Sequence, residues 1–237
     1  MNYAIRWACY RLCQLQRKLG SLWAYVYTRL RTPALMRAYR SVAETGGKGA
    51  TQQPYKGYDL LRILRCHRPR RILELGSGTT TAVFAYYAKH HGATLISYEH
   101  SSEWAKSTNR SLVASGLVAD PSPVRVVNMR VAEDRSGTYY ADPIPEDADF
   151  VYVDGPPCLK FDGNKKPNLD VIRLFDRGIY PACIVVDGRT ETVDRILEHP
   201  VAAKYRAEFE FIYAFRHCHY MTCLKFNRHT ILTLQRE

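Results

Sequence analysis

The sequence of 237 residues lacks the long apolar run that a membrane-spanning helix requires. Its longest charge-free run near the N-terminus is Leu19 to Thr28, whereas a helix needs about 20 apolar residues to cross a bilayer. The seven cysteines are an odd set without paired CxxC spacing, which is atypical of a secreted disulfide framework. We therefore expect a cytoplasmic protein without a transmembrane helix.

Acidic residues are almost missing from the first third of the chain. Residues 1–71 contain 15 Lys and Arg but only Glu44 and Asp59, while residues 72–237 contain 19 basic and 21 acidic residues. A protein that grips nucleic acid with its main domain would carry basic charge there. The distribution disfavours nucleic acid as a partner and predicts a basic attachment segment at the N-terminus.

This N-terminal segment has the apolar spacing of amphipathic helices. Apolar residues recur every three or four positions, at Leu12, Leu15, Leu19, Leu22, Val26 and Leu30. With its arginines and aromatic rings, such a helix suits the headgroup layer of an anionic membrane. A helix that packs on its own domain or on a partner has the same pattern. An organelle transit peptide is disfavoured because serine is scarce.

A Gly-rich linker at residues 44–51 predicts a domain boundary. We expect a basic helical segment over residues 1–45, able to hold the protein peripherally on the cytoplasmic membrane face, and one domain over residues 46–237. Homo-oligomerisation is left open.

Beyond the linker, strand and helix patterns alternate. The expected strands are residues 71–75, 95–99, 124–128, 149–154, 183–187, 208–215 and 229–234, and the expected helices are residues 80–90, 103–115, 169–177 and 191–197. Nearly continuous apolar strands such as Ile184–Val186 are typical of a parallel sheet covered on both faces. The order predicts a doubly wound, Rossmann-like α/β fold, mostly parallel, with an antiparallel last strand.

The turn after the first strand has the features of a cofactor site. In doubly wound sheets, ligands bind beyond the carboxyl ends of the strands. Gly76 and Gly78 let a ligand approach the backbone, and the next helix offers free N–H groups. Glu99 ends the second strand, 21 residues after Gly78, where a carboxylate can accept both hydroxyls of a ribose. Together they predict a nucleoside-bearing cofactor.

These residues resemble class I S-adenosylmethionine-dependent methyltransferases, which place an acidic residue two positions before the first glycine, as Glu74 is here. A dinucleotide fingerprint would require Gly at position 81, which is Thr. The resemblance covers about Tyr55 to Leu234, and the Lys56-Gly57 pair is similar to catechol-type and caffeoyl-CoA-type O-methyltransferases. It implies S-adenosylmethionine as cofactor, bound by Lys56, Glu74, Gly76, Ser77, Gly78, Thr80, Glu99, His100, Met129 and Asp154.

The resemblance also implies roles for two aspartates at strand ends. In metal-dependent members, the residues that correspond to Asp154 and Asp187 hold a divalent cation such as Mg²⁺ beside the substrate oxygens. Their third ligand is Asn where this chain has Gly188, so sites with and without metal both stay open. Asp154 is the main catalytic candidate for activating an acceptor hydroxyl, and Lys160 is a second.

The predicted activity is O-methylation of a small molecule or a saccharide. The Asp154-Gly-Pro-Pro-Cys158 segment departs from the Asp/Asn-Pro-Pro-aromatic tetrad of enzymes that methylate base amino groups. The His217, His219 and Cys223 cluster lacks the second ligand pair of a zinc site. Two alternatives are an RNA-directed methyltransferase that uses the basic first third, and a non-catalytic scaffold that binds the cofactor.

Overall fold

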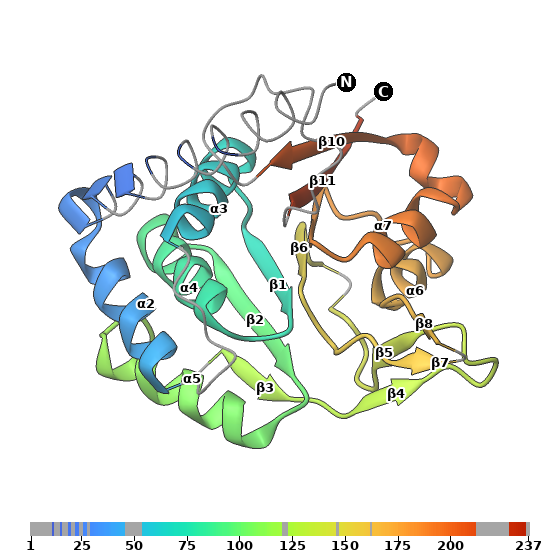
Figure 1. Ribbon diagram of the computed structural model, residues 1–237, viewed down its shortest axis with the longest axis horizontal. Helices are drawn as coiled ribbons and strands as arrows, with labels where there is room; N and C mark the ends of the chain where they lie inside the picture. The colour runs from blue at the N-terminus through green and yellow to red at the C-terminus, as the bar shows by residue number, and fades with distance from the viewer. Residues whose placement is uncertain are drawn as a thin grey trace.

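The computed structural model describes residues 29–45, 54–119, 123–145, 147–161, 163–211 and 228–235, together with Arg11, Leu15, Leu19, Leu22, Trp23, Val26 and Tyr27. Its main strands are β1 (Arg71–Leu75), β2 (Thr94–Glu99), β3 (Val124–Val126), β6 (Phe150–Val153), β9 (Cys183–Asp187), β10 (Tyr205–Phe211) and β11 (Arg228–Leu234). They form one sheet in the order β10-β11-β9-β6-β1-β2-β3 (Figure 1). β11 is antiparallel to both of its neighbours, and the other pairs are parallel. The predicted doubly wound sheet with an antiparallel last strand is confirmed.

Helices cover both faces of this sheet. They are α2 (Pro33–Thr45), α3 (Pro54–His67), α4 (Thr79–His91), α5 (Ser102–Ala114), α6 (Asp170–Asp176), α7 (Thr190–Leu197) and the 3₁₀ helix η2 (Pro200–Lys204). Alternate strand residues enter two separate cores: Ile72 packs in the cluster of α2 to α5, and Leu73 in the cluster of α6 and α7. Burial on both faces explains why the central strands read as continuous apolar runs.

The edges of the fold differ from the expected bounds. The strand expected at 124–128 ends at Val126, because the chain leaves the sheet for β4 (Met129–Val131), which pairs with β5 (Thr138–Tyr140). The strand expected at 208–215 begins at Tyr205 in β10, and residues 212–215 lie outside the described part of the chain.

The second half of the N-terminal segment belongs to the hydrophobic core. In α2, Leu35, Ala38, Tyr39 and Val42 are buried in the same cluster as α4 and the strands. Residues 46–53 lie outside the described residues, so the boundary expected between residues 45 and 46 stays a prediction.

Two glycine turns touch where β1 and β6 end. Leu75 pairs with Val153 across these parallel strands, so the turns that follow leave the sheet at the same level. A Cβ on Gly76 would lie 2.6 Å from the backbone nitrogen of Gly155, and a Cβ on Gly155 would lie 2.5 Å from the Cα of Gly76. Only glycine at both positions permits this backbone contact between Gly76 and Gly155, which we call the glycine contact.

This contact predicts unequal costs for two glycine substitutions. Gly76 has φ of +94° and a crowded Cβ position, whereas Gly92, at the end of α4, has φ of +67° and no atom within 4 Å of its Cβ position. Gly92→Ala should cost only the backbone strain, about 1–2 kcal/mol, and Gly76→Ala should cost at least about 3 kcal/mol, because a clash adds to the strain. Urea unfolding measures both. Equal losses in the two variants would show that the contact is not tight.

Candidate functional site

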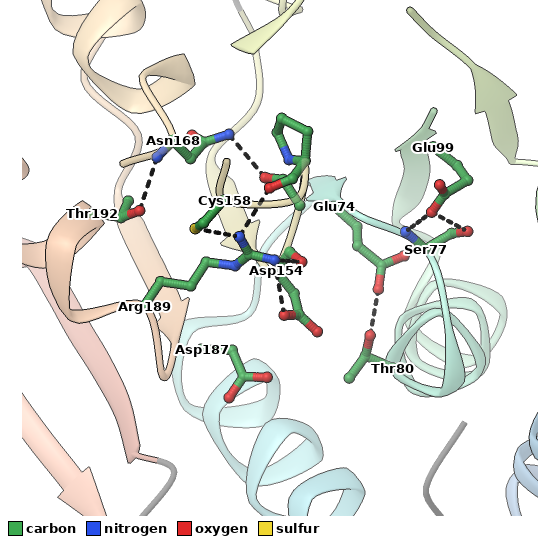
Figure 2. Close-up of polar contacts among 12 residues, drawn as sticks. Glu74, Ser77, Thr80, Glu99, Asp154, Cys158, Asn168, Asp187, Arg189 and Thr192 are labelled. Carbon is green, nitrogen blue, oxygen red and sulfur yellow. Dashed lines mark hydrogen bonds and ion pairs between the residues drawn. The ribbon is translucent and has the colours of Figure 1, made fainter. Parts of the chain in front are cut away.

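The predicted site residues gather at the carboxyl edge of the sheet. Figure 2 shows Ser77, Thr80 and Glu99 around the turn between β1 and α4, and Asp154 and Asp187 after β6 and at the end of β9. These strands are neighbours in the sheet, so their ends form two adjoining halves of one site. The glycine contact joins the halves.

Glu74 stabilises the turn between β1 and α4, which contains Gly76 and Gly78, through buried hydrogen bonds. Its carboxylate has no exposed surface and accepts hydrogen bonds from Thr80 Oγ1 at 2.6 Å, Thr81 Oγ1 at 2.7 Å and Ser97 Oγ at 2.7 Å. Burial raises the pKa of Glu74 to about 7, although these hydroxyls favour its charged form. Glu74 and Thr80, both predicted as cofactor contacts, therefore bond to each other and fix the turn onto α4.

Glu99 and Ser77 form the other side of the turn, where Glu99 is only 4% exposed. The Ser77 backbone N–H and hydroxyl both donate to Glu99 Oε2 at 3.1 Å, while the Ser101 N–H donates to Oε1 at 2.9 Å. His100 Nδ1 also lies 2.9 Å from Oε1. The carboxylate is thus held by two fixed backbone donors and two side chains that can rotate away.

Trp104 is a member of this half that sequence reasoning missed. Its indole Nε1–H donates to the Ser77 carbonyl at 2.7 Å, and its backbone N–H donates to the Ser101 hydroxyl, which caps α5. The start of α5 is thereby tied to the glycine turn. Nothing in the local sequence pattern separates this tryptophan from an ordinary packing residue.

Lys56 lies between the two aspartates of the other half. Its ammonium, from the first turn of α3, donates to Asp187 Oδ2 and is 3.9 Å from Asp154 Oδ2. The side chains of Lys56 and Asp187 are only 12% and 6% exposed, whereas that of Asp154 is 39% exposed. Asp154 is therefore the member of the cluster that solvent or a ligand can reach.

The surroundings shift the pKa values of the two aspartates in opposite directions. Burial raises the pKa of Asp154 to about 6, with Lys56 acting against this shift and Asp187 adding to it. Burial also opposes ionisation of Asp187, but the Lys56 ammonium holds the pKa of Asp187 below its ordinary value. For Lys56, burial disfavours the charge, yet the two carboxylates raise its pKa. Lys56 and Asp187 therefore form a charged pair.

His229 and Tyr152 lie behind Asp187. His229 Nε2 is 3.7 Å from Asp187 Oδ1, and burial lowers the pKa of His229 to about 4, so its ring is neutral at pH 7. The Tyr152 hydroxyl, also fully buried, favours the charged form of Asp187. Within the described residues, Asp187 Oδ1, the Tyr152 hydroxyl and His229 Nε2 have no hydrogen-bond partner, so these groups border the back of Asp187 without bonding to it, while its front faces Lys56.

Arg189 clamps the turn after β6. Its guanidinium donates to the carbonyl oxygens of Asp154 and Pro156, the latter at 2.9 Å, and lies 3.1 Å from Cys158 Sγ and 3.4 Å from Asp154 Oδ1 (Figure 2). Sequence reasoning missed this residue. Its place two residues after β9 was the available signal, because residues that follow strands of such a sheet reach its ligand edge.

A buried polar network holds the same turn from the other side. Asn168 Nδ2 donates to the Gly155 carbonyl at 2.8 Å and to Asp170 Oδ2 at 2.7 Å, and the Asn168 N–H donates to Thr192 Oγ1 at 3.0 Å. The Tyr140 N–H donates to Asp170 Oδ1 at 3.1 Å, and burial raises the pKa of Asp170 to about 7. The network binds the turn to α6 and α7.

The residues present do not fit a Mg²⁺ site, which the sequence left open. Among the described residues, no group of three His, Cys, Asp or Glu side chains is arranged to hold a metal ion. Asp154 and Asp187 are close, but the Lys56 ammonium lies between them, and Gly188 supplies no third side chain. The described residues therefore do not support Asp154 and Asp187 as ligands of a divalent metal ion.

Three further predicted residues lie apart from the aspartates. His100 bonds Glu99, and Met129 is half-buried three residues after Val126, which pairs with Glu99. Lys160 is exposed in β7 (Lys160–Phe161), which pairs with β8 (Asn164–Lys165). The described contacts do not connect Lys160 with Asp154, and its catalytic role stays a prediction. The His217, His219 and Cys223 cluster lies outside the described residues.

Comparisons with known proteins identify the fold. No protein-family model and no curated protein matches the chain. An S-adenosylhomocysteine-bound methyltransferase from Podospora anserina shares 13% identity and a TM-score of 0.57, over 90% of this chain and 94% of that one. The O-methyltransferase TomG from Streptomyces achromogenes, in complex with S-adenosylmethionine, shares 16% identity and a TM-score of 0.54, over 93% and 99%. A putative caffeoyl-CoA O-methyltransferase from Staphylococcus aureus shares 10% identity and a TM-score of 0.53, over 91% and 99%. These similarities confirm the expected class I methyltransferase fold.

The buried carboxyl of Glu74 predicts a pH-dependent stability. Its pKa is about 7 in the fold against 4.5 ordinarily, so the native state holds a proton that the unfolded state has already released. This contribution, about 3 kcal/mol, is complete below pH 4.5 and is lost as the pH rises through about 7. Glu74→Gln carries no charge, and the surrounding hydroxyls can donate to or accept from its amide.

We therefore expect Glu74→Gln to reduce the fall in unfolding free energy between pH 4.5 and 8, as measured by urea unfolding at each pH. Part of the fall should remain, because the pKa of Asp170 is also raised to about 7. The control Glu103→Gln, on the exposed first turn of α5, should keep the wild-type slope. Identical slopes for all three proteins would contradict the assigned pKa.

Proposed function

We propose that the protein is an S-adenosylmethionine-dependent methyltransferase that acts on an oxygen of a small molecule or a saccharide. The observation that carries this proposal is the junction of two half-sites: Ser77 and Glu99 on one side of the glycine contact, and Asp154 with its cations on the other. The three similar structures named above support it. Two of them are O-methyltransferases by name, and two were solved with S-adenosylmethionine or S-adenosylhomocysteine.

The first half-site fits the cofactor. Glu99 is fixed by the backbone N–H groups of Ser77 and Ser101, and its remaining partners are the Ser77 hydroxyl and His100. Two ribose hydroxyls can take the places of these rotatable groups without moving the carboxylate. The buried Tyr140 hydroxyl, unbonded within the described residues, would lie 2.8 Å from a Cβ on Gly155. An unsatisfied hydroxyl beside the glycine contact suits a polar ligand there.

The second half-site fits an acceptor hydroxyl. When bound, S-adenosylmethionine supplies an electrophilic methyl carbon on its sulfonium. Asp154 is the reachable carboxylate, and its pKa of about 6 leaves it mostly ionised at neutral pH, so it can accept the proton of a hydroxyl. Its exposure lets that proton return to solvent. Arg189 fixes the backbone that carries it.

Glu99→Gln tests the cofactor assignment. The substitution keeps the shape of the side chain but removes the charge that would bind the ribose. Hydrogen bonds to charged groups contribute about 1.5–3 kcal/mol, so affinity for S-adenosylhomocysteine should fall about tenfold to a hundredfold in calorimetry. The exposed Glu103→Gln should bind as the wild type does. A preference of the wild type for NAD, or unchanged affinity in Glu99→Gln, would contradict the assignment.

We also propose that the N-terminal segment attaches the enzyme to an anionic membrane surface. Described positions before Arg31 are helical, and an apolar set spaced by four, three, four and four residues is 44% to 74% exposed. The set is Leu15, Leu19, Leu22, Val26 and Leu30. This spacing puts all five on one helix face. Arg11, Arg29 and Arg31 are exposed near it, and this positive charge suits anionic lipids.

Another face of this segment contacts the domain. The rings of Trp23 and Tyr27 lie 5.0 and 5.2 Å from that of Tyr58 in α3. The apolar set therefore stays exposed while the segment is anchored. Within the described residues, no helix is long and apolar enough to cross a bilayer, and the proposed attachment is at the headgroup level.

Vesicle co-sedimentation tests the attachment. The wild type should pellet with phosphatidylserine-containing vesicles and less so in high salt, because part of the attraction is electrostatic. Leu22→Glu with Leu30→Glu should abolish pelleting, since charges then enter the apolar face. The matched control Leu197→Glu alters an exposed leucine of α7 and should pellet like the wild type. Equal pelleting of the double variant would refute the proposal.

A further inference from the structure

We infer that Lys56 is the resident cation of the acceptor half-site, and that its ammonium takes the place of a divalent metal between Asp154 and Asp187. This inference rests on the proposed methyltransferase function, because it names the group that offers positive charge to the acceptor oxygen. It also explains how two carboxylates lie side by side in a largely buried site.

The fold places Lys56 firmly. The next residue, Gly57, lies against Tyr39 of α2 and Val83 of α4, where a Cβ would already be 3.4 Å from each side chain. The first turn of α3 is thus held against two helices of the core. From there, Lys56 extends to Asp187 at the end of β9 and to Asp154 after β6.

Asp187 is built to hold an ammonium. It is almost fully buried, the neutral His229 and the Tyr152 hydroxyl lie behind it, and Lys56 is in front. Within the described residues, Asp187 is the only group at hydrogen-bond distance from Lys56 Nζ. An ammonium has three N–H donors. Lys56 therefore retains donors for an acceptor oxygen that approaches the more exposed Asp154.

A divalent cation would need the position that Lys56 holds. Two carboxylates alone are a weak site for a hard cation, which normally takes six or more oxygens, several of them from water. A second positive charge beside the ammonium and the nearby Arg189 guanidinium would be repelled. The wild-type site should therefore exclude Mg²⁺ and Mn²⁺.

Removing the ammonium should create the metal site that the wild type lacks. In Lys56→Ala, Asp154 and Asp187 lose their shared cation, and Mn²⁺ should bind with a Kd of about 10⁻⁴–10⁻³ M, as expected for few charged ligands. Electron paramagnetic resonance measures the bound Mn²⁺ in the full-length protein. Millimolar Mg²⁺ should raise the Tm of Lys56→Ala and leave that of the wild type unchanged.

The double variant Lys56→Ala/Asp187→Asn guards against loss of folding, since it removes the buried pair together and leaves no buried charge unpaired. It should fold in the presence of chelator and bind no Mn²⁺. The exposed Lys106→Ala on α5 is the matched control and should behave as the wild type.

Mn²⁺ binding by the wild type that Asp187→Asn abolishes would overturn the inference, and so would a folded Lys56→Ala that binds no Mn²⁺. If Lys56→Ala fails to fold, the wild-type measurement alone decides. Binding of S-adenosylhomocysteine is measured separately on the wild type. A wild type that does not bind it would contradict the proposed function, whereas the Mn²⁺ results test only the role of Lys56.

Discussion

The close contact of two backbones, at Gly76 and Gly155, is the constraint on which the site depends. It joins the turn after β1, with Ser77 facing Glu99, to the turn after β6, with Asp154 at its start. A side chain at either glycine would force the turns apart and separate the half-sites. The turns are held from outside this contact: Glu74 bonds three hydroxyls beneath one, and Arg189 and Asn168 bond the carbonyls of the other.

Carboxyl groups of one chemical type perform different tasks here because their surroundings differ. Glu74 and Asp170 are fully buried, and burial raises the pKa of each to about 7 although Arg173 lies 3.9 Å from Asp170 Oδ1. Both carboxyl groups hold the two turns in place. Asp187 is also buried, but Lys56 keeps it charged. Asp154 combines partial exposure with a pKa of about 6. Among these carboxyls, only Asp154 joins access and a pKa near neutrality, which are the properties of a general base.

The sequence was sufficient to predict the elements that carry repeated patterns. Strands such as Cys183–Asp187 were predictable because burial on both faces leaves a continuous apolar run, and Glu99 because ligand residues follow strands. The partners of these residues were not predictable. Lys56 was expected at the cofactor, yet it reaches Asp187, 131 positions away, since the packing of α3 determines its direction. The network of Asn168, Asp170 and Thr192 likewise depends on how α6 and α7 meet, and no local pattern records that.

A crystal structure grown with S-adenosylhomocysteine and millimolar MgCl₂ tests the central claim, that one half-site binds the cofactor and the other uses Lys56 as its cation. The account predicts the ribose at Glu99, the homocysteine end near the glycine contact, and Lys56 Nζ still bonded to Asp187 without a metal ion between the aspartates. A metal ion bound by Asp154 and Asp187, with Lys56 displaced, would contradict the role of Lys56. Density for the ligand away from Ser77 and Glu99 would contradict the cofactor site itself.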